Sequence, residues 1–364
     1  MSGGVDSSVS AALLLKQGFE VIGVTLQLQA CEDSLEGKSC CGTDSVAQAR
    51  AAAGHLGINH YVLDCRQEFE KTVLLRCWEE YSRGRTPNPC IICNERIKFG
   101  MLLDYAGRLD ADKVATGHYA RIGRRKNGAL FLKRGVDLRK DQSYFLFSIR
   151  EERLAGILFP IGELTKDSVR SMARQIGLPN ASREESQDAC FAAKETGYSE
   201  GLRRRFNKAP IPGPLMDEEG RVLGMHKGIH QFTIGQRRGL GVTLGAPAWV
   251  KSIDPKLAAV LITTRKEALS SSGLTATGVR WIALAPNFKR IRCSIQVRYN
   301  QAPVPAVIET GKDATAIIRF ERPLRAVTPG QAVVFFHRDR ILGGGWIERS
   351  ETLGDNGTID TPRV

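Results

Sequence analysis

A candidate phosphate-binding loop lies at the start of the chain. It reads Ser2-Gly3-Gly4-Val5-Asp6-Ser7-Ser8 and leads directly into a helical pattern over 9–16. Adjacent glycines let the backbone approach an anion closely, and the hydroxyls, amides and dipole at a helix start attract phosphate. The loop lacks the Gly-Lys-Ser/Thr ending of a Walker motif. The sequence therefore predicts a phosphate loop of another class.

Thiols form a second candidate site. Cys90 and Cys93 lie in Gly84-Arg85-Thr86-Pro87-Asn88-Pro89-Cys90-Ile91-Ile92-Cys93-Asn94, a proline-stiffened loop that leads into a predicted helix. The helix dipole lowers the pKa of a thiol in the first turn, which favours a nucleophile or a soft-metal ligand. A third thiol, Cys190, follows in 185–191. We expect Cys65, Cys77 and Cys293 to be ordinary buried thiols.

The loop and the thiols need a scaffold that brings them together. Up to about residue 180, predicted strands (20–28, 60–64, 113–116) alternate with predicted helices (45–56, 67–83, 91–108), which indicates a parallel sheet. After about residue 205, alternating runs at 292–299, 314–320 and 332–337 predict antiparallel strands. We therefore predict a Rossmann-like α/β domain (1–205), a small central domain (206–271) and a C-terminal antiparallel β-barrel (272–364). The strand expected before the phosphate loop is absent from the sequence, so we expect the first strand of the sheet to be missing.

Charge is distributed unevenly along the chain. The 364 residues carry a net charge of +13, with 27 Lys and Arg against 26 Asp and Glu in 1–200 but 25 against 13 in 201–364. This excess indicates a polyanionic partner, most often a nucleic acid, or else a charge that serves solubility. No apolar run approaches the ~20 residues of a membrane span, and the stretch 9–15 has no basic leader. Nine cysteines, an odd number, favour reduced thiols over a disulfide framework. We therefore expect a cytoplasmic protein.

Taken together, these segments resemble the tRNA-specific 2-thiouridylases, and the first loop is similar to the pyrophosphate loop of the ATP pyrophosphatase superfamily. Further matching segments are Cys40-Cys41-Gly42, Gly117-His118-Tyr119-Ala120-Arg121, Lys140-Asp141-Gln142-Ser143-Tyr144-Phe145-Leu146, Gly235-Gln236-Arg237-Arg238-Gly239-Leu240-Gly241 and Val297-Arg298-Tyr299. The resemblance covers essentially the whole chain. It implies an ATP-dependent sulfurtransferase that replaces the C2 oxygen of the wobble uridine of tRNA through an adenylated uracil, with Mg²⁺ shielding the phosphate charge.

The resemblance also implies roles for individual residues. Cys190 would carry the persulfide, Cys93 would be its partner thiol, and the two would end as a disulfide. Residues at the nucleotide positions of the family are Ser2, Gly3, Gly4, Val5, Asp6, Ser7, Leu26 and Gly117. Those at the target-base positions are Asn88, Pro89 and Cys90. Those at the tRNA-contacting positions are His118, Lys140, Asp141, Gln142, Arg298, Tyr299 and Gln331. The implied partners are the anticodon stem-loop of tRNA and a sulfur-donor protein or persulfide relay, with neither DNA nor a membrane among them.

The sequence departs from the commoner family pattern at Cys90, where many members carry Asp. A cysteine accepts a proton less readily than an aspartate at neutral pH. Three thiolates are, however, the usual number for an iron-sulfur cluster with one open iron. A [4Fe-4S] cluster on Cys90, Cys93 and Cys190 is therefore an alternative to the persulfide relay.

Two further functions are compatible with parts of the sequence. An ATP-dependent synthetase acting on a small carboxylate would use the loop, but it leaves the thiols and the basic second half without a role. A non-catalytic tRNA-binding protein with an impaired ATP loop would need a damaged loop or a lost Cys190. Neither loss is present in the sequence.

Overall fold

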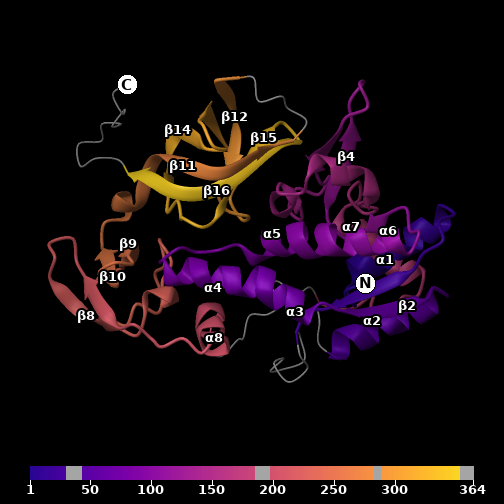
Figure 1. The fold of residues 1–364 in the computed structure, drawn as a ribbon, viewed down its shortest axis with the longest axis horizontal. Coiled ribbons are helices and arrows are strands. Elements are labelled where there is room, and N and C mark those ends of the chain that lie inside the picture. Colours follow the sequence, from indigo (N-terminus) through magenta and orange to yellow (C-terminus); the bar gives the residue numbers. More distant parts are fainter. Residues whose placement is uncertain (30–42, 185–196, 283–287, 353–364) are drawn as a thin grey trace. The chain divides into compact units, whose positions relative to one another are not determined.

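The structure is a computed structural model that describes residues 1–29, 43–184, 197–282 and 288–352 (Figure 1). The chain divides into two compact units, each built from separate stretches of sequence. Unit 1 comprises Met1–Leu74, Pro89–Tyr198 and Asp339–Ile341, and unit 2 comprises Leu75–Asn88, Ser199–Arg338 and Leu342–Val364. The bounds predicted above for the three domains stay a prediction. Among the helices that the structure describes, none combines the length and the apolar character needed to cross a bilayer.

Unit 1 is an α/β unit with two parallel strand pairs, β1 with β2 and β3 with β6. Its strands are β1 (Gly23–Gln27), β2 (His60–Asp64), β3 (Val114–Ala115), β4 (Ala120–Arg124), β5 (Leu130–Arg134) and β6 (Ile157–Leu158). Its helices are α1 (Val5–Lys16), α2 (Thr43–His55), α3 (Arg66–Phe69), α5 (Pro89–Cys93), α6 (Leu102–Arg108) and α7 (Lys166–Gln175). Two π-helical segments, η2 (Glu70–Leu74) and η3 (Asn94–Met101), and two 3₁₀ segments, η4 (Ser143–Leu146) and η5 (Glu151–Gly156), complete it. The predicted parallel α/β domain is thereby confirmed.

The core of unit 1 holds the start of α1 in place. Val5 and Val9 of α1 pack with Val169 and Ala173 of α7 in one buried apolar cluster. In the described residues, α1 is the first element of the chain. The carbonyl oxygen of Met1 accepts a hydrogen bond of 2.6 Å from the Thr25 hydroxyl of β1. The chain therefore enters α1 alongside β1.

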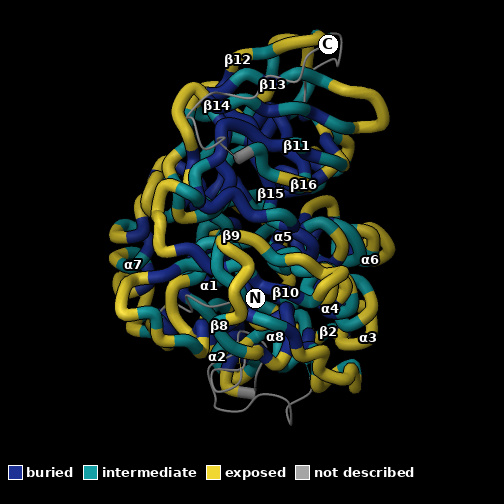
Figure 2. Tube along the Cα trace, turned by 90° about the vertical axis from the view of Figure 1, so that its left-hand side faces the viewer, coloured by how far each residue is buried: buried dark blue, intermediate teal, exposed yellow. Residues whose placement is uncertain are grey.

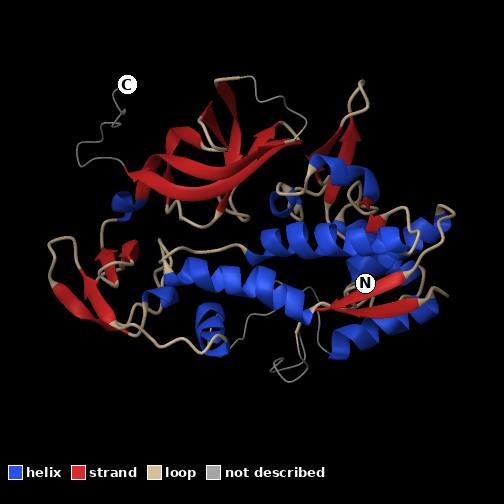
Figure 3. Ribbon diagram, in the orientation of Figure 1, coloured by secondary structure: helices blue, strands red, loops and turns tan. Residues whose placement is uncertain are grey.

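Unit 2 contains a small sheet and a barrel, which Figure 3 colours as strands. The small sheet has the order β8-β7-β10-β9. Its strands are β7 (Gly213–Met216), β8 (Val222–His226), β9 (Trp249–Asp254) and β10 (Ala259–Thr263). Associated helical segments are α8 (Tyr198–Arg205), η6 (Ile229–Gln231) and η7 (Lys266–Leu269). This sheet has its own apolar core, which includes Leu215, Val250 and Val260.

The barrel runs β11-β14-β13-β12-β15-β16 and closes because β11 also pairs with β16. Its strands are β11 (Ser270–Trp281), β12 (Arg290–Gln296), β13 (Val304–Thr310), β14 (Ala316–Arg325), β15 (Ala332–His337) and β16 (Arg340–Thr352). Closure removes the free strand edges of the sheet. Five of the six residues of β15 are buried, and Figure 2 shows this strand in dark blue. The predicted C-terminal antiparallel barrel is confirmed.

One stretch of the first half of the chain, Leu75–Asn88, belongs to unit 2. It consists of α4 (Leu75–Ser82) and the loop that follows, and we call it the strap. Trp78 of α4 makes an edge-on ring contact with His230 of η6 at 5.6 Å. The strap ends one residue before Pro89, where α5 of unit 1 begins.

Candidate active site

In the described part of the chain, no side chain caps the helix that follows the phosphate loop. Gly4 is the N-cap of α1, with extended backbone and no side-chain hydrogen bond to the first turn. The Ser7 and Ser8 hydroxyls both donate to the Gly4 carbonyl oxygen, at 3.0 and 3.2 Å. The first amides of α1 therefore have no capping side chain, and they carry the positive end of the helix dipole. This arrangement suits an anion.

The carbonyl of Gly3 is held by two residues that the sequence did not single out. Asn180 donates through Nδ2 to the Gly3 oxygen at 2.9 Å and to the Ser8 hydroxyl at 2.9 Å. Arg183 donates to the same oxygen at 3.2 Å and pairs with Asp44 at 2.9 Å. Gly3 has φ +72°, and a Cβ there would lie 2.4 Å from the Ser45 carbonyl oxygen. The loop conformation thus requires glycine and is fixed from one side.

Asp6 is engaged in a largely buried ion pair. Its Oδ1 atom lies 2.7 Å from the Lys166 ammonium and accepts the Tyr119 hydroxyl at 2.9 Å. Lys166 is only 6% exposed and begins α7, while its backbone amide donates to Asp137. The Lys166 ammonium therefore neutralises the one acidic side chain of the phosphate loop. Sequence spacing gave no sign of Lys166, because it lies 160 residues from Asp6.

Gly117 packs directly against the phosphate loop. A Cβ at this position would come 2.8 Å from the Asp6 carbonyl carbon and 2.8 Å from the Ser7 nitrogen. Leu26 is half-buried on β1, one residue after Thr25, which bonds the chain as it enters the loop. The structure therefore gathers the predicted nucleotide residues in one part of unit 1.

The thiols of the proline-rich segment lie on α5. Cys93 is buried at 4% exposure, whereas Cys90, in the first turn, is half-buried. Cys65 is near enough to Cys93 to interact electrostatically with it; burial first, then Asp64 and Cys93, raise the pKa of Cys65 to about 12. Burial also raises the pKa of Cys293 to about 12. Cys65, Cys77 and Cys293 are buried, as predicted.

The predicted third thiol, Cys190, lies outside the described residues, as do Cys40 and Cys41. Within the described ranges, no group of three or more His, Cys, Asp or Glu side chains is arranged to hold a metal ion. The described residues thus supply two of the three cluster ligands, Cys90 and Cys93, three positions apart on α5. They do not make a complete cluster site.

Two of the predicted tRNA residues in unit 1, Asp141 and Gln142, are bonded to backbone at or near Tyr119. Asp141 is buried, pairs with Arg134 at 2.6 Å, and accepts the Gly135 amide at 3.0 Å. Gln142 accepts the Tyr119 amide at 3.1 Å. Lys140 precedes them and is half-buried. Asp141 and Gln142 therefore shape the segment that presents Lys140.

His118 forms a cluster with two aromatic rings, which also contact each other at 5.9 Å. Its ring centroid is 5.9 Å from that of Phe99 and 6.1 Å from that of Phe159, and Nδ1 lies 2.8 Å from the Thr116 hydroxyl. Desolvation, and then the positive charge of Lys98, hold the pKa of His118 well below its usual value. The imidazole is therefore neutral at neutral pH, and it can hydrogen-bond RNA but adds no charge to binding.

In unit 2, the side chains of Gln331 and Arg298 also donate hydrogen bonds to backbone carbonyl oxygens. Gln331 donates through Nε2 to the carbonyl oxygens of Thr86 and Pro87, at 3.0 and 3.1 Å. Arg298 donates to the carbonyl oxygens of Ile234 and Ala326, at 3.1 and 2.8 Å. Tyr299 is half-buried beside it, and its own carbonyl oxygen accepts from Gln296. Gln331 thus fixes the strap just before the predicted target-base residue Asn88, which is buried.

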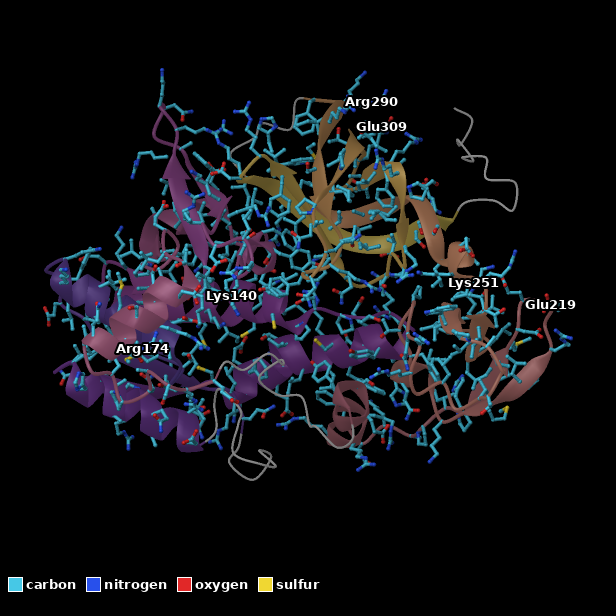
Figure 4. The ribbon with its side chains drawn as sticks, turned by 180° about the vertical axis from the view of Figure 1, so that it is seen from behind. Lys140, Arg174, Glu219, Lys251, Arg290 and Glu309 are labelled. Atoms are coloured by element: carbon cyan, nitrogen blue, oxygen red, sulfur yellow. The ribbon has the colours of Figure 1, made fainter. Side chains whose placement is uncertain are left out.

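The surface of unit 2 also carries ion pairs within its own strands. Arg290 of β12 and Glu309 of β13, labelled in Figure 4, approach to 3.8 Å. Glu218 binds both Lys251 and Arg265, and Arg265 foremost lowers the pKa of Glu218 to about 2. Arg237 and Arg238, by contrast, are exposed in the loop after η6. Part of the positive charge of the second half is therefore neutralised locally, and part is not.

The fold and the loop define a three-module HUP-type protein. A profile described as the tRNA methyl transferase HUP domain matches residues 1–194. Profiles described as the tRNA methyl transferase PRC-barrel domain and the aminomethyltransferase beta-barrel domain match 200–264 and 271–347. The predicted order of an α/β domain, a small central domain and a β-barrel is confirmed.

Relatives over the whole chain identify the family. The tRNA-specific 2-thiouridylase MnmA of Geobacter metallireducens is 44% identical over 97% of this chain and 97% of its own. Those of Chloroflexus aggregans and Carboxydothermus hydrogenoformans are 47% and 46% identical over 96% of this chain and 98% and 96% of theirs. The chain belongs to the tRNA-specific 2-thiouridylase family, which confirms the resemblance seen in the sequence.

Proposed function

We propose that this chain exchanges the C2 oxygen of the wobble uridine of tRNA for sulfur, with consumption of ATP. As a member of its family it is a tRNA-modifying sulfurtransferase. One observation carries the proposal: the phosphate loop and the thiol-bearing helix α5 belong to the same compact unit. In that unit the loop is followed by the uncapped start of α1, and Gly117 packs against it.

The loop serves the first half-reaction. The amide carbonyl of uracil is a poor electrophile, and adenylation of its oxygen turns that oxygen into a leaving group. Pyrophosphate, released in this step, would be held by the amides of Gly3 to Ser7 and by the hydroxyls of Ser2 and Ser7. Lys166, paired with Asp6 at 2.7 Å, neutralises the acidic side chain of the loop, which would otherwise repel these phosphates. Mg²⁺ would shield the remaining charge.

Thiols serve the second half-reaction. In one route the Cys93 thiolate attacks the Cys190 sulfur of the persulfide, which forms a Cys93–Cys190 disulfide and releases hydrosulfide. Hydrosulfide then attacks C2 of the adenylated uracil and AMP departs with the former carbonyl oxygen. In the other route the terminal persulfide sulfur attacks C2 directly, and Cys93 then displaces the thiouridine. Both routes end in a disulfide, which a thiol reductant must reopen with two electrons.

Recognition of the RNA would be shared among several segments. We assign Asn88, Pro89 and Cys90 to the target base, because Gln331 fixes the strap directly before them. His118, Lys140, Asp141, Gln142, Arg298, Tyr299 and Gln331 remain our proposed tRNA-contacting positions, with the anticodon stem-loop as ligand. Four of these side chains hydrogen-bond the protein backbone, namely those of Asp141, Gln142, Arg298 and Gln331. Much of their effect on tRNA binding would therefore come from the shape that they give the surface. A cytoplasmic sulfur-donor protein or persulfide relay would reload Cys190.

The experiment that tests the proposal is anaerobic, single-turnover thiolation of unmodified tRNA with ATP, Mg²⁺ and a persulfide as sulfur donor, with 2-thiouridine measured by nucleoside mass spectrometry. The proteins compared are the wild type, Cys90→Ala, Cys93→Ala and Cys190→Ala, with Cys293→Ala in the barrel as the matched control. We expect thiolation by the wild type and by the control. We expect it to fall by about two orders of magnitude or more when Cys93 or Cys190 is replaced, because each loses a nucleophile.

The remaining outcomes separate the mechanisms. Loss in all three site variants, together with iron and visible absorbance after anaerobic reconstitution, would replace the relay by a [4Fe-4S] cluster on Cys90, Cys93 and Cys190. Activity that survives in Cys90→Ala alone favours the two-thiol relay. Absence of any thiouridine from the wild type would contradict the proposed function.

A further inference from the structure

A basic β-hairpin in unit 1 has no role in the reaction described above. It consists of β4, β5 and the turn between them. No acidic residue occurs from Lys113 to Val136, whereas seven are Lys or Arg. Averaging over the first 200 residues, which are nearly neutral, hides this local excess. Figures 1 and 4 show the hairpin projecting from the other elements of unit 1.

The basic residues at the base of the hairpin are neutralised. Arg121 pairs with Asp339 at 3.1 Å and Lys133 with the same carboxylate at 2.9 Å. Arg134 pairs with the buried Asp141. Nearer the tip, Phe131 is 5% exposed and packs beneath the Arg340 guanidinium at 4.4 Å. The base is therefore a fixed support.

Close packing between the two strands stiffens the hairpin further. Gly123 of β4 faces Phe131 of β5, and a Cβ on Gly123 would come 2.5 Å from the Phe131 ring. The turn is closed by hydrogen bonds from Arg125 to Ala129 and from Gly128 to Arg125, at 2.8 and 2.9 Å. The tip is therefore held at a defined distance from its support.

The three basic residues at the tip have a different environment. No ion pair engages Arg124, Arg125 or Lys126 among the described residues. Arg124 and Lys126 are exposed. The Nε atom of Arg125 is buried and has no hydrogen-bond partner in the described part of the chain. Three adjacent cations repel one another, and a bound anion lowers the free energy of this repulsion.

The chemistry of the tip favours phosphate over bases. Bases of single strands are read by stacking on aromatic side chains, and the one aromatic residue of the hairpin, Phe131, is 5% exposed and covered by the Arg340 guanidinium. Arg and Lys side chains at a turn contact phosphate oxygens without reading sequence. The hairpin base also joins the segment that presents Lys140, through the Arg134–Asp141 pair and the Gln142–Tyr119 bonds. The tip and Lys140 thus extend from one support.

We infer that Arg124, Arg125 and Lys126 bind the phosphodiester backbone of the tRNA substrate, as a contact separate from the predicted tRNA-contacting residues. This inference rests on the proposed function, since it takes tRNA as the ligand. The hairpin adds affinity without sequence preference, because its contacts are with the backbone.

The test measures the affinity of unmodified tRNA over a range of salt concentrations for the wild type and for Arg124→Gln/Arg125→Gln/Lys126→Gln. The matched control removes three exposed cations elsewhere in unit 1, as Lys16→Gln/Lys71→Gln/Arg174→Gln. We expect the tip variant to bind about tenfold or more weakly at physiological salt, and its slope of log K against log salt to fall by about two to three. The charge-preserving Arg124→Lys/Arg125→Lys variant should keep most of the wild-type affinity and most of the wild-type salt slope.

Each other outcome is decisive. A tip variant with the affinity and the salt slope of the wild type overturns the inference, as does a control variant that loses as much. Equal thermal unfolding of all variants excludes misfolding as the cause. Failure of the wild type itself to bind tRNA would reject the proposed function and, with it, the hairpin's ligand.

Discussion

Gly117 shows how one missing side chain shapes the nucleotide site. We predict that Gly117→Ala weakens ATP binding by about tenfold or more, because its Cβ would lie 2.8 Å from the backbone of Asp6 and Ser7 and must displace the loop. The matched control is Gly107→Ala in α6, where a Cβ meets nothing within 4 Å and the helix gains up to about 1 kcal/mol of stability. Calorimetric titration with ATP measures both variants. Equal ATP affinity in the two would contradict the placement of the nucleotide at this loop.

Among individual residues, the sequence predicted those that would contact a ligand better than those that hold the contacting residues in place. Gly3 and Gly117 could be predicted because their types and spacing are unusual. Lys166, Asn180 and Arg183 could not, because one Lys, Asn or Arg far along the chain is indistinguishable from a surface residue until the fold brings it to the loop. Asp141 and Gln331 are predicted to contact RNA. In the structure, Asp141 accepts a hydrogen bond from the Gly135 amide, and Gln331 donates one to the Thr86 carbonyl oxygen.

Among the elements, the strap depends most on close backbone contact. We predict that Gly330→Ala destabilises the protein by about 1–3 kcal/mol more than Gly220→Ala. Both glycines have positive φ, +88° and +82°, but only a Cβ on Gly330 would collide, at 2.9 Å from the Thr86 nitrogen and oxygen. Chemical denaturation measures the free energy of unfolding. If the two variants lose the same stability, backbone strain alone explains the effect, and the strap is not held by this contact.

Element positions followed from periodicity, but the division of the chain did not. The strand predicted at 60–64 is observed as β2 with those bounds. The helix predicted over 67–83 is α3, η2 and α4 in succession, and the boundary between the two units falls inside it, between Leu74 and Leu75. A continuous helical pattern gives no sign of such a boundary, because both halves bury an apolar face and only the partners differ.

For the whole molecule, the net charge of +13 matters through the cations that remain unpaired. We predict that Arg237→Glu/Arg238→Glu weakens tRNA binding and flattens its salt dependence, because each lost phosphate contact removes about 0.7–0.9 from the slope of log K against log salt. Both arginines are exposed. Lys256→Glu/Lys266→Glu, also exposed in unit 2, is the matched control. An unchanged slope in the arginine variant would remove this loop from the RNA interface.

The strap also has a consequence for the order in which the protein folds. Its residues 75–88 are synthesised early, yet Arg85 bonds Glu348 and Thr86 bonds Pro329, more than 240 residues later. Contacts between such distant residues close late, since the loop-closure entropy must be overcome first. During synthesis on the ribosome, the bonds of Arg85 and Thr86 therefore form only after the barrel strands emerge, and Trp78 of α4 stays uncovered until η6 has been synthesised. Chaperones that bind exposed apolar segments would meet this stretch first.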